Sequence, residues 1–282
     1  MRKLLLIFSA ALCCDLALLF WCLAPHPNLA VYFFDVGEGD SELISWSNGA
    51  KVLVDGGRAG RLGAELGRAL GSAERRIDLM LLTHCQVDHL GGLKEVAERY
   101  EIGVFAYNGC IYNPPEWTLL EKELDKRGVR LVALAAGDRL RIGESEIKIL
   151  SPLPNLRPAV SDENERAITF LLQDSGRSFL FMSAAPPELE EQVVAEIGSA
   201  VDVLKVSHHG SRFSSTRNFL AIARPKLSVV EVGTNSYGHP AAEVLERLGL
   251  YGSVYRTDLS GTIRVFLDYG TLRIFSARPP AG

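Results

Sequence analysis

The stretch LLTHCQVDHLGG, residues 81–92, passes from an apolar segment into a polar turn. It holds two of the six histidines of the chain, His84 and His89, together with Asp88. Imidazole and carboxylate groups are ligands that zinc, manganese and iron accept. The two glycines that close the stretch leave room for the chain to double back, so the three side chains can converge. We therefore predict a metal-binding turn at the end of a buried strand.

A second segment of the same form offers further donors. VDVLKVSHHGS, residues 201–211, is an apolar strand that leads into His208 and His209 and then a glycine turn. A single histidine more often forms a hydrogen bond to a neighbouring loop than coordinates a metal. Two strands that both end in histidines favour a metal site instead, because α/β folds gather their sites at strand ends.

The rest of the chain alternates short apolar runs with amphipathic segments. IDLMLLT (77–83) is nearly continuous in apolar residues, as expected for a strand covered on both faces. Segments 114–128 and 186–198 have helical spacing, with proline at the start and glycine at the end. No low-complexity linker or charge run interrupts residues 31–276. We predict a single α/β domain over residues 28–282.

The N-terminus has the composition of a targeting or anchoring segment, assigned to residues 1–27. Arg2 and Lys3 precede an apolar run over residues 4–24, whose one charge is Asp15. At about 1.5 Å per residue this run can cross a hydrocarbon core of roughly 30 Å. An uncleaved anchor is favoured over a cleaved signal peptide, because the run is long and lacks a good cleavage site. The positive residues before it predict a single-pass protein with its domain outside the cytoplasm.

Composition and cysteine use exclude some classes. The 282 residues are 47% hydrophobic and 23% charged, with a net charge of −4, so no strongly basic nucleic-acid footprint is present. The five cysteines form no CxxC pair, which disfavours a zinc knuckle or a disulfide framework. Cys110 is expected to be a small buried apolar residue. Cys85 follows His84 directly, and a minor alternative makes its sulfur a soft metal ligand.

Six motifs occur in the order found in one known family: FFDVGEGDS, VLVDGG, LLTHCQVDHLGGL, VDVLKVSHHGSRFSS, NSYGHP and YRTDLSG. From about Val31 to about Phe275 the chain resembles the metallo-β-lactamase-like domain of the ComEC-type DNA-uptake (late competence) proteins. The resemblance implies an αββα four-layer sandwich with its site at one edge of two sheets, here preceded by one N-terminal hydrophobic helix.

The chain departs from the family pattern at two ligand positions. Gln86 stands at the position of the second histidine of the usual HxHxDH motif. Ala184 stands at the position of the aspartate that bridges two metals in the family. The resemblance implies two metal positions. One is bound by the two HxH histidines and a third donor, and the other by the Asp–His pair and a histidine from later in the chain. Gln86 weakens the first position, so we predict one zinc or manganese ion, or two that are held loosely. The predicted ligands are His84, Asp88, His89 and His208.

Other residues are predicted to act on the substrate or to support the ligands. Asp88 would orient a water molecule as well as bind metal, and His239 would donate a proton or hydrogen bond to a leaving oxygen. In an alternative of equal weight, Asp40 and Asp55 only accept hydrogen bonds from backbone amides of their loops. The predicted supporting residues are Asp40, Asp55, Gln86 and His209.

The metal-binding motifs and the apolar N-terminal run predict a membrane-anchored, metal-dependent hydrolase, and the family resemblance implies that it cleaves phosphodiester bonds of DNA during its uptake. The predicted partners are DNA, the membrane, and a separate channel protein in that membrane, because only one membrane segment is present. One alternative is a degenerate domain that binds DNA or a partner without hydrolysis. Another is a hydrolase of different substrates, such as lactones or thioesters.

Overall fold

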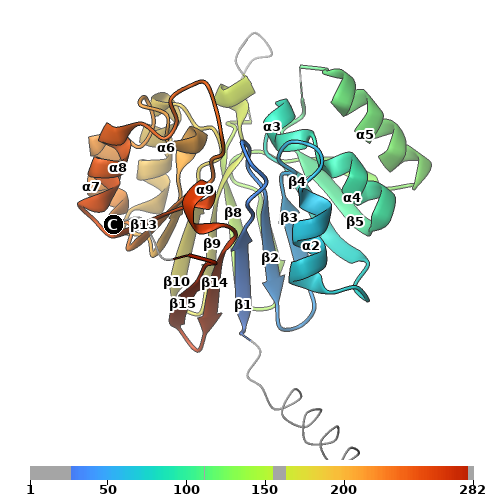
Figure 1. Ribbon diagram of the computed structural model, residues 1–282, viewed down its shortest axis with the longest axis horizontal. Helices are drawn as coiled ribbons and strands as arrows, with labels where there is room; N and C mark the ends of the chain where they lie inside the picture. The colour runs from blue at the N-terminus through green and yellow to red at the C-terminus, as the bar shows by residue number, and fades with distance from the viewer. Residues whose placement is uncertain (1–26, 111, 155–162, 279–282) are drawn as a thin grey trace, which may run out of the picture.

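Two β-sheets packed face to face form the centre of the protein (Figure 1). The computed structural model describes residues 27–110, 112–154 and 163–278. The first sheet has the order β15-β14-β1-β2-β3-β4-β5-β6 and the second β13-β12-β11-β10-β9-β8-β7. The strands of the first sheet are β1 (Leu29–Phe33), β2 (Glu42–Trp46), β3 (Lys51–Val54), β4 (Arg76–Leu82), β5 (Glu101–Tyr107), β6 (Arg130–Ala133), β14 (Ile263–Asp268) and β15 (Thr271–Phe275). Those of the second are β7 (Arg139–Ile142), β8 (Ser145–Ser151), β9 (Thr169–Asp174), β10 (Arg177–Phe181), β11 (Val203–Lys205), β12 (Leu227–Val230) and β13 (Ser253–Arg256).

Helices cover the outer face of each sheet, which gives four layers (Figure 1). The helices α2, α4 and α5 lie on the first sheet, and α6, α7 and α8 lie on the second. The helical segments are α2 (Leu62–Leu70), α3 (Val87–Leu90), α4 (Leu93–Arg99), α5 (Pro115–Lys126), α6 (Pro187–Ile197), α7 (Arg217–Ala223), α8 (Ala242–Gly249), α9 (Thr257–Ser260), η1 (Glu163–Arg166) and η2 (Ser207–Gly210). The predicted αββα sandwich is confirmed.

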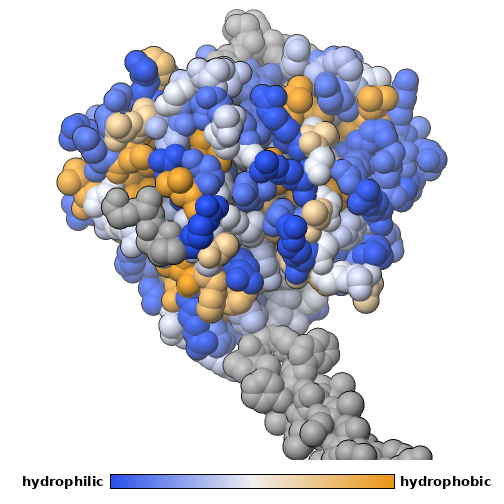
Figure 2. All heavy atoms as spheres, viewed as in Figure 1, coloured by the Kyte–Doolittle hydropathy of each residue, from blue (hydrophilic) through white to orange (hydrophobic). Residues whose placement is uncertain are grey.

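Three apolar clusters hold these layers together. The central cluster lies between the sheets and includes Phe33, Phe170 and Phe181, whose rings pack with centroids 4.3 and 6.0 Å apart. The other two clusters lie between each sheet and its helices. Since β4 contributes Leu79 to the central cluster and Met80 to an outer one, both of its faces are buried, as its continuous apolar run predicts. Polar side chains cover most of the surface in Figure 2, with apolar ones in small separate patches.

The direction of the strands determines where the site lies. β3, β4, β5 and β6 are parallel, and so are β10, β11, β12 and β13. Parallel neighbours bring their carboxyl ends to the same edge of a sheet. The segments that follow β3, β4, β11 and β12 therefore meet at one edge of the sandwich.

The structure corrects the predicted membrane topology. The predicted anchor over residues 4–24 lies outside the described residues. Among the helices that the structure does describe, none is long and apolar enough to cross a membrane. The longest, α5, has 12 residues and extends about 18 Å, against a hydrocarbon core of roughly 30 Å. The prediction of a single-pass membrane protein with an extracytoplasmic domain is thus not supported.

Candidate metal centre

Three loops of the first sheet are joined by backbone hydrogen bonds at the site edge. The Asp40 amide donates to the Asp88 carbonyl at 3.1 Å, and the Gly57 amide donates to the Asp40 carbonyl at 2.8 Å. Gly39 lies between them with φ of 140°, and a Cβ there would come within 2.3 Å of the Asp88 carbonyl oxygen. Only glycine permits this close approach. The motifs DVGEGD, DGG and HCQVDH are therefore held in one fixed arrangement.

His89 is oriented by the carboxylate of Asp55. The His89 Nδ1 lies 2.7 Å from Asp55 Oδ2, and Asp55 also accepts hydrogen bonds from the Thr83 amide and hydroxyl at 2.8 and 2.7 Å. Burial opposes charge on His89, but the carboxylates of Asp55 and Asp40 raise its pKa overall. With Nδ1 engaged, Nε2 is the ring atom left to bind a ligand, an arrangement common among metal-bound histidines.

His84 shares this arrangement and has an unsatisfied nitrogen. Its Nδ1 is 3.0 Å from the Thr83 hydroxyl, and its ring centroid lies 4.0 Å from that of His89. Its Nε2 is buried without a hydrogen-bond partner. Burial and the neighbouring His89 lower the pKa of His84 well below its usual value, so the imidazole is neutral. A neutral, buried and unpaired ring nitrogen is what a metal ligand requires.

His209 completes the group from the second sheet. Its Nδ1 lies 2.9 Å from the Glu231 carbonyl oxygen and 3.2 Å from Asp40 Oδ1, while its Nε2 lies 3.3 Å from Asp88 Oδ2. Despite its burial, Asp40 and Asp88 raise the pKa of His209 to about 10. The same interactions hold the pKa of Asp88 below its usual value, against the effect of burial.

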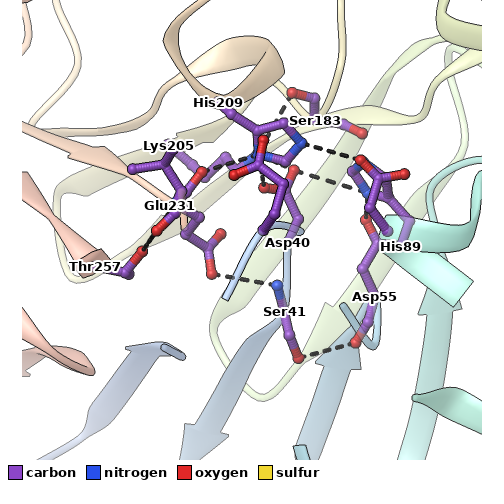
Figure 3. Close-up of polar contacts among 12 residues, drawn as sticks. Asp40, Ser41, Asp55, His89, Ser183, Lys205, His209, Glu231 and Thr257 are labelled. Carbon is purple, nitrogen blue, oxygen red and sulfur yellow. Dashed lines mark hydrogen bonds and ion pairs between the residues drawn. The ribbon is translucent and has the colours of Figure 1, made fainter. Parts of the chain in front are cut away.

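Two overlapping groups of donors result (Figure 3). In each group the ligand atoms lie within 4.8 Å of one another. Figure 3 shows His209 from one sheet facing His89 from the other, with Asp40 between them. The groups are Asp88–His89–His209 and Asp40–Asp55–His89.

The predicted ligands do not all meet. Asp88 and His89 share a donor group, and His84 lies against His89 without belonging to either group. His208 points elsewhere, with its ring 6.2 Å from that of His209 and 5.5 Å from that of His239. His208 and His209 both have left-handed φ values, 50° and 52°, which turn adjacent side chains in different directions. Burial and the neighbouring histidines lower the pKa of His208 to about 4. His209, expected in a supporting role, is the histidine that faces Asp88.

The two departures from the family pattern also occupy the site. Gln86 lies beside His84 and lines a cavity of about 540 Å³ above the donors. Ala184 is buried and offers no donor. Its neighbour Ser183 instead donates to the Thr83 hydroxyl at 2.8 Å. The predicted His239 lies on the wall of the same cavity, and its Nδ1 is buried without a hydrogen-bond partner.

A buried charged cluster behind the donors was not predicted from the sequence. Lys205 is 1% exposed, and its ammonium group hydrogen-bonds Asp40 and lies 3.4 Å from the Ser183 carbonyl oxygen. Glu42 and Glu231 are buried nearby, and burial raises the pKa of Glu42 to about 8 and that of Glu231 well above its usual value. The available signal was a single charge within a mainly apolar strand, as for Glu42 and Lys205, or directly after one, as for Glu231.

Cys85 and Cys110 form a disulfide, which corrects two expectations. Neither cysteine is a free apolar residue, and Cys85 is not available as a metal ligand. Their Cα atoms are 5.9 Å apart across 25 residues of sequence. The sequence did not reveal this pair because β4 and β5, the strands that precede the two cysteines, become neighbours only in the folded sheet. The bond ties the segment that carries His84 to the loop after β5.

We expect reduction of this disulfide to lower the free energy of unfolding by about 2–4 kcal/mol, because the bond closes a loop of 25 residues. Urea unfolding with and without a thiol reductant measures the change. In the double variant Cys85→Ala/Cys110→Ala, the reductant should have no effect. Equal stability of the wild-type protein in both conditions would contradict the expectation.

Comparisons with known proteins agree with this fold. The model of the beta-lactamase superfamily domain matches residues 50–209, so the chain belongs to the beta-lactamase superfamily. Among solved structures, the metallo-β-lactamase fold protein YhfI from Bacillus subtilis gives a TM-score of 0.56 at 10% identity, over 84% of this chain and 99% of that one. CmlA, a diiron β-hydroxylase from Streptomyces venezuelae, gives 0.54 at 17% identity, over 86% and 55%.

Curated relatives place the chain more narrowly. ComE operon protein 3 of Bacillus subtilis (strain 168) is 26% identical over 98% of this chain and 38% of its own length. Recombination protein 2 of Haemophilus influenzae is 29% identical over 96% and 33%. The resemblance to the metallo-β-lactamase-like domain of ComEC-type competence proteins is confirmed. The chain spans roughly a third of the length of these relatives.

Proposed function

We propose that this domain is a metal-dependent hydrolase that cleaves phosphodiester bonds of DNA in connection with DNA uptake. The observation that carries the proposal is the donor group Asp88–His89–His209, together with the partnerless, buried Nε2 of His84, whose ring lies 4.0 Å from that of His89. Each of the three imidazoles has its Nδ1 engaged by a neighbouring oxygen. Such preorganised donors fit a divalent ion and have no comparable use in a purely structural turn.

The residues that would hold an ion are His84, Asp88, His89 and His209. Because the pKa of His209 is about 10 without an ion, its imidazole would release a proton on binding one. This set puts His209 in the role that the sequence assigned to His208. Gln86 and Ala184 remove donors from a second position, which favours one well-held ion. When bound, the ion would supply Lewis acidity toward a phosphoryl oxygen and lower the pKa of a water molecule.

Protein side chains would carry the remaining steps. Asp88, which is ionised at neutral pH, would accept a hydrogen bond from the attacking water and orient it. His239 is half-buried, and burial with the nearby His209 lowers its pKa, so it is neutral at pH 7. A neutral imidazole on the cavity wall can donate its ring N–H to a phosphate or leaving oxygen.

The names of the relatives support a role in DNA uptake, since ComE operon protein 3 and competence protein ComA of Neisseria gonorrhoeae match most of this chain. DNA is the macromolecule that this role requires. A channel protein in the membrane is the partner that it implies.

Metal content and hydrolysis together test the proposal. The full chain is stripped with a chelator, reloaded with Mn²⁺ or Zn²⁺, and assayed for bound metal by mass spectrometry. We expect about one tightly bound ion per chain and hydrolysis of bis(p-nitrophenyl) phosphate and linear DNA only after reloading. Absence of bindable metal, or DNA cleavage at the same rate in excess chelator, would overturn the proposal.

The second candidate function is DNA or partner binding without hydrolysis. Gln86 and Ala184 favour it, because both stand where the family pattern has metal ligands. A reloaded chain that binds metal and DNA but does not cleave either substrate would establish this alternative instead.

A further inference from the structure

The two sheets have four edge strands, and β15 differs from the other three. The edges are β15 and β6 in the first sheet and β13 and β7 in the second. Among the large apolar side chains of these four described strands, only Ile274 and Phe275 of β15 are exposed, by 37% and 42%. β7, by contrast, carries Arg139 and Arg141, and charged side chains are a common protection of a free edge. An exposed apolar edge strand is a surface on which another strand can pair.

The hairpin geometry determines which backbone groups of β15 are free. β14 and β15 pair antiparallel around a two-residue turn at 269–270, whose φ values of 44° and 76° indicate a type I′ turn. In such a turn Asp268 and Thr271, the residues that close it, are hydrogen-bonded to each other. Hydrogen-bonded and non-bonded pairs then alternate along the ladder. The amide and carbonyl groups of Leu272 and Ile274 consequently point away from β14, toward the open edge.

Both ends of β15 are held in place. At the turn, Arg177 Nε from β10 donates to the Gly270 carbonyl oxygen at 2.7 Å. After the strand, the Ala277 amide donates to the Ser260 carbonyl oxygen at 3.0 Å, which ties the chain to α9. The edge is therefore extended before any partner arrives, and less entropy is lost when a strand pairs with it.

The two faces of β15 differ in chemistry. Ile274 is opposite Val265 of the central cluster, so it lies on the inner face of the sheet. Arg273 and Phe275 lie on the outer face, where the Phe275 ring packs on Phe266 with centroids 5.2 Å apart. None of the three apolar clusters includes Phe266 or Phe275, and one of the small apolar patches in the lower part of Figure 2 lies over this hairpin. An added strand therefore meets an apolar inner side and an aromatic, basic outer side.

The outer face of the hairpin has an excess of positive charge. The guanidinium of Arg264 lies 6.0 Å from the Phe275 ring centroid and forms no ion pair with any residue that the structure describes. Arg273 reaches Asp268 only at 3.8 Å, and its side chain is 58% exposed. Two copies paired through β15 would bring these arginines together, and like charges on facing strands are destabilising. The edge consequently favours an acidic strand over a second copy of this chain.

We propose that the open edge of β15 binds an extended segment of another protein in which apolar and acidic residues alternate. The segment adds to the eight strands of the first sheet, antiparallel to β15. Its backbone pairs with the free groups of Leu272 and Ile274, its apolar side chains pack beside Ile274, and an acidic side chain faces Arg273. In strand addition, main-chain hydrogen bonds supply affinity and alternate side chains supply specificity. None of these residues lines the site cavity, so the inference does not depend on the proposed function.

Fluorescence anisotropy of a labelled peptide, Gly-Val-Glu-Val-Glu-Val-Gly, titrated with the full chain tests the inference. We expect saturable binding with Kd below about 1 mM. Ile274→Pro removes an amide that points to the open edge and not one bonded to β14. It should weaken binding by about 5- to 150-fold, because a carbonyl of the peptide is left unpaired. Arg273→Glu should reverse the charge preference, so that this variant binds the corresponding valine–lysine peptide more tightly than the valine–glutamate one.

Matched controls lie on another edge and in the peptide itself. Arg141→Glu on β7, whose side chain is 78% exposed, should leave binding unchanged. A peptide methylated at its backbone nitrogens cannot pair as a strand and should not bind wild-type protein, a result that depends on no variant folding. The inference is overturned if that peptide binds equally well, or if the valine–lysine peptide binds wild type as tightly as the valine–glutamate one. A wild-type dimer that Ile274→Pro abolishes would also overturn it, since a second copy would then occupy the edge.

Discussion

Asp88→Ala is expected to lower the metal-dependent rate of phosphodiester hydrolysis by more than about 100-fold. Loss of a residue that only supports a metal ligand typically costs about 10- to 100-fold. Asp88 is placed to do more, because its carboxylate lies 3.3 Å from His209 Nε2 and belongs to a donor group with His89. Its loss removes one ligand and the acceptor that orients water. Rates on bis(p-nitrophenyl) phosphate with saturating Mn²⁺ measure the effect.

Three further variants separate this role from a general loss of structure. Asp125→Ala removes an exposed carboxylate from α5 and should keep full activity. His209→Ala should lose bound metal, because its ring faces Asp88. His208→Ala should retain the metal, because its ring is turned toward His239. Activity that survives in Asp88→Ala, or metal loss in His208→Ala with metal retention in His209→Ala, would contradict the assigned donor set.

Lys205→Met is expected to destabilise the protein by about 3–5 kcal/mol. The substitution removes the ammonium group from a pair with Asp40 in which both side chains are 1% exposed, and breaking a buried pair by removing one partner costs that much. Glu42 and Glu231 cannot replace the cation, because both are acids. Urea unfolding in excess chelator measures the loss, since a bound ion would otherwise partly compensate for the missing ammonium. In a domain of this size, each kcal/mol lowers Tm by about 2–4 °C.

Lys226→Met is the matched control for this substitution. Lys226 also pairs with an aspartate, Asp202, at 2.8 Å, but its side chain is 67% exposed. A surface pair of this kind contributes about 0–1 kcal/mol. The two lysine variants should therefore differ by at least about 2 kcal/mol. Equal, small losses in both would show that the Lys205–Asp40 pair does not neutralise a buried charge.

The fold and the location of the site could be predicted from sequence because both depend on local patterns. The apolar run before His84 has the length and composition of a strand covered on both faces, and β4 is one. Because α/β folds place their sites at strand ends, the histidines after the two apolar strands are expected near each other, although β4 and β11 belong to different sheets. The supporting role predicted for Asp55 also agrees with its hydrogen bonds to His89 and Thr83, since it directly follows β3.

The choice between neighbouring residues could not be predicted in this way. His208 and His209 are adjacent and chemically identical, and their order along the chain does not say which faces Asp88. A left-handed backbone at both positions decides it, and that conformation depends on packing around the turn. The pairing of Cys85 with Cys110 likewise depends on β4 lying beside β5.

By itself, the sequence determined the αββα class, the superfamily, and the His- and Asp-bearing turns that line one edge of the sandwich. Periodicity and motif order carry this information because they reflect which residues each strand or helix must bury. Tertiary structure alone decided that His209 faces Asp88 and that Lys205 pairs with Asp40. These contacts join residues 121 and 165 positions apart, and only the packing of the two sheets against each other fixes their distances.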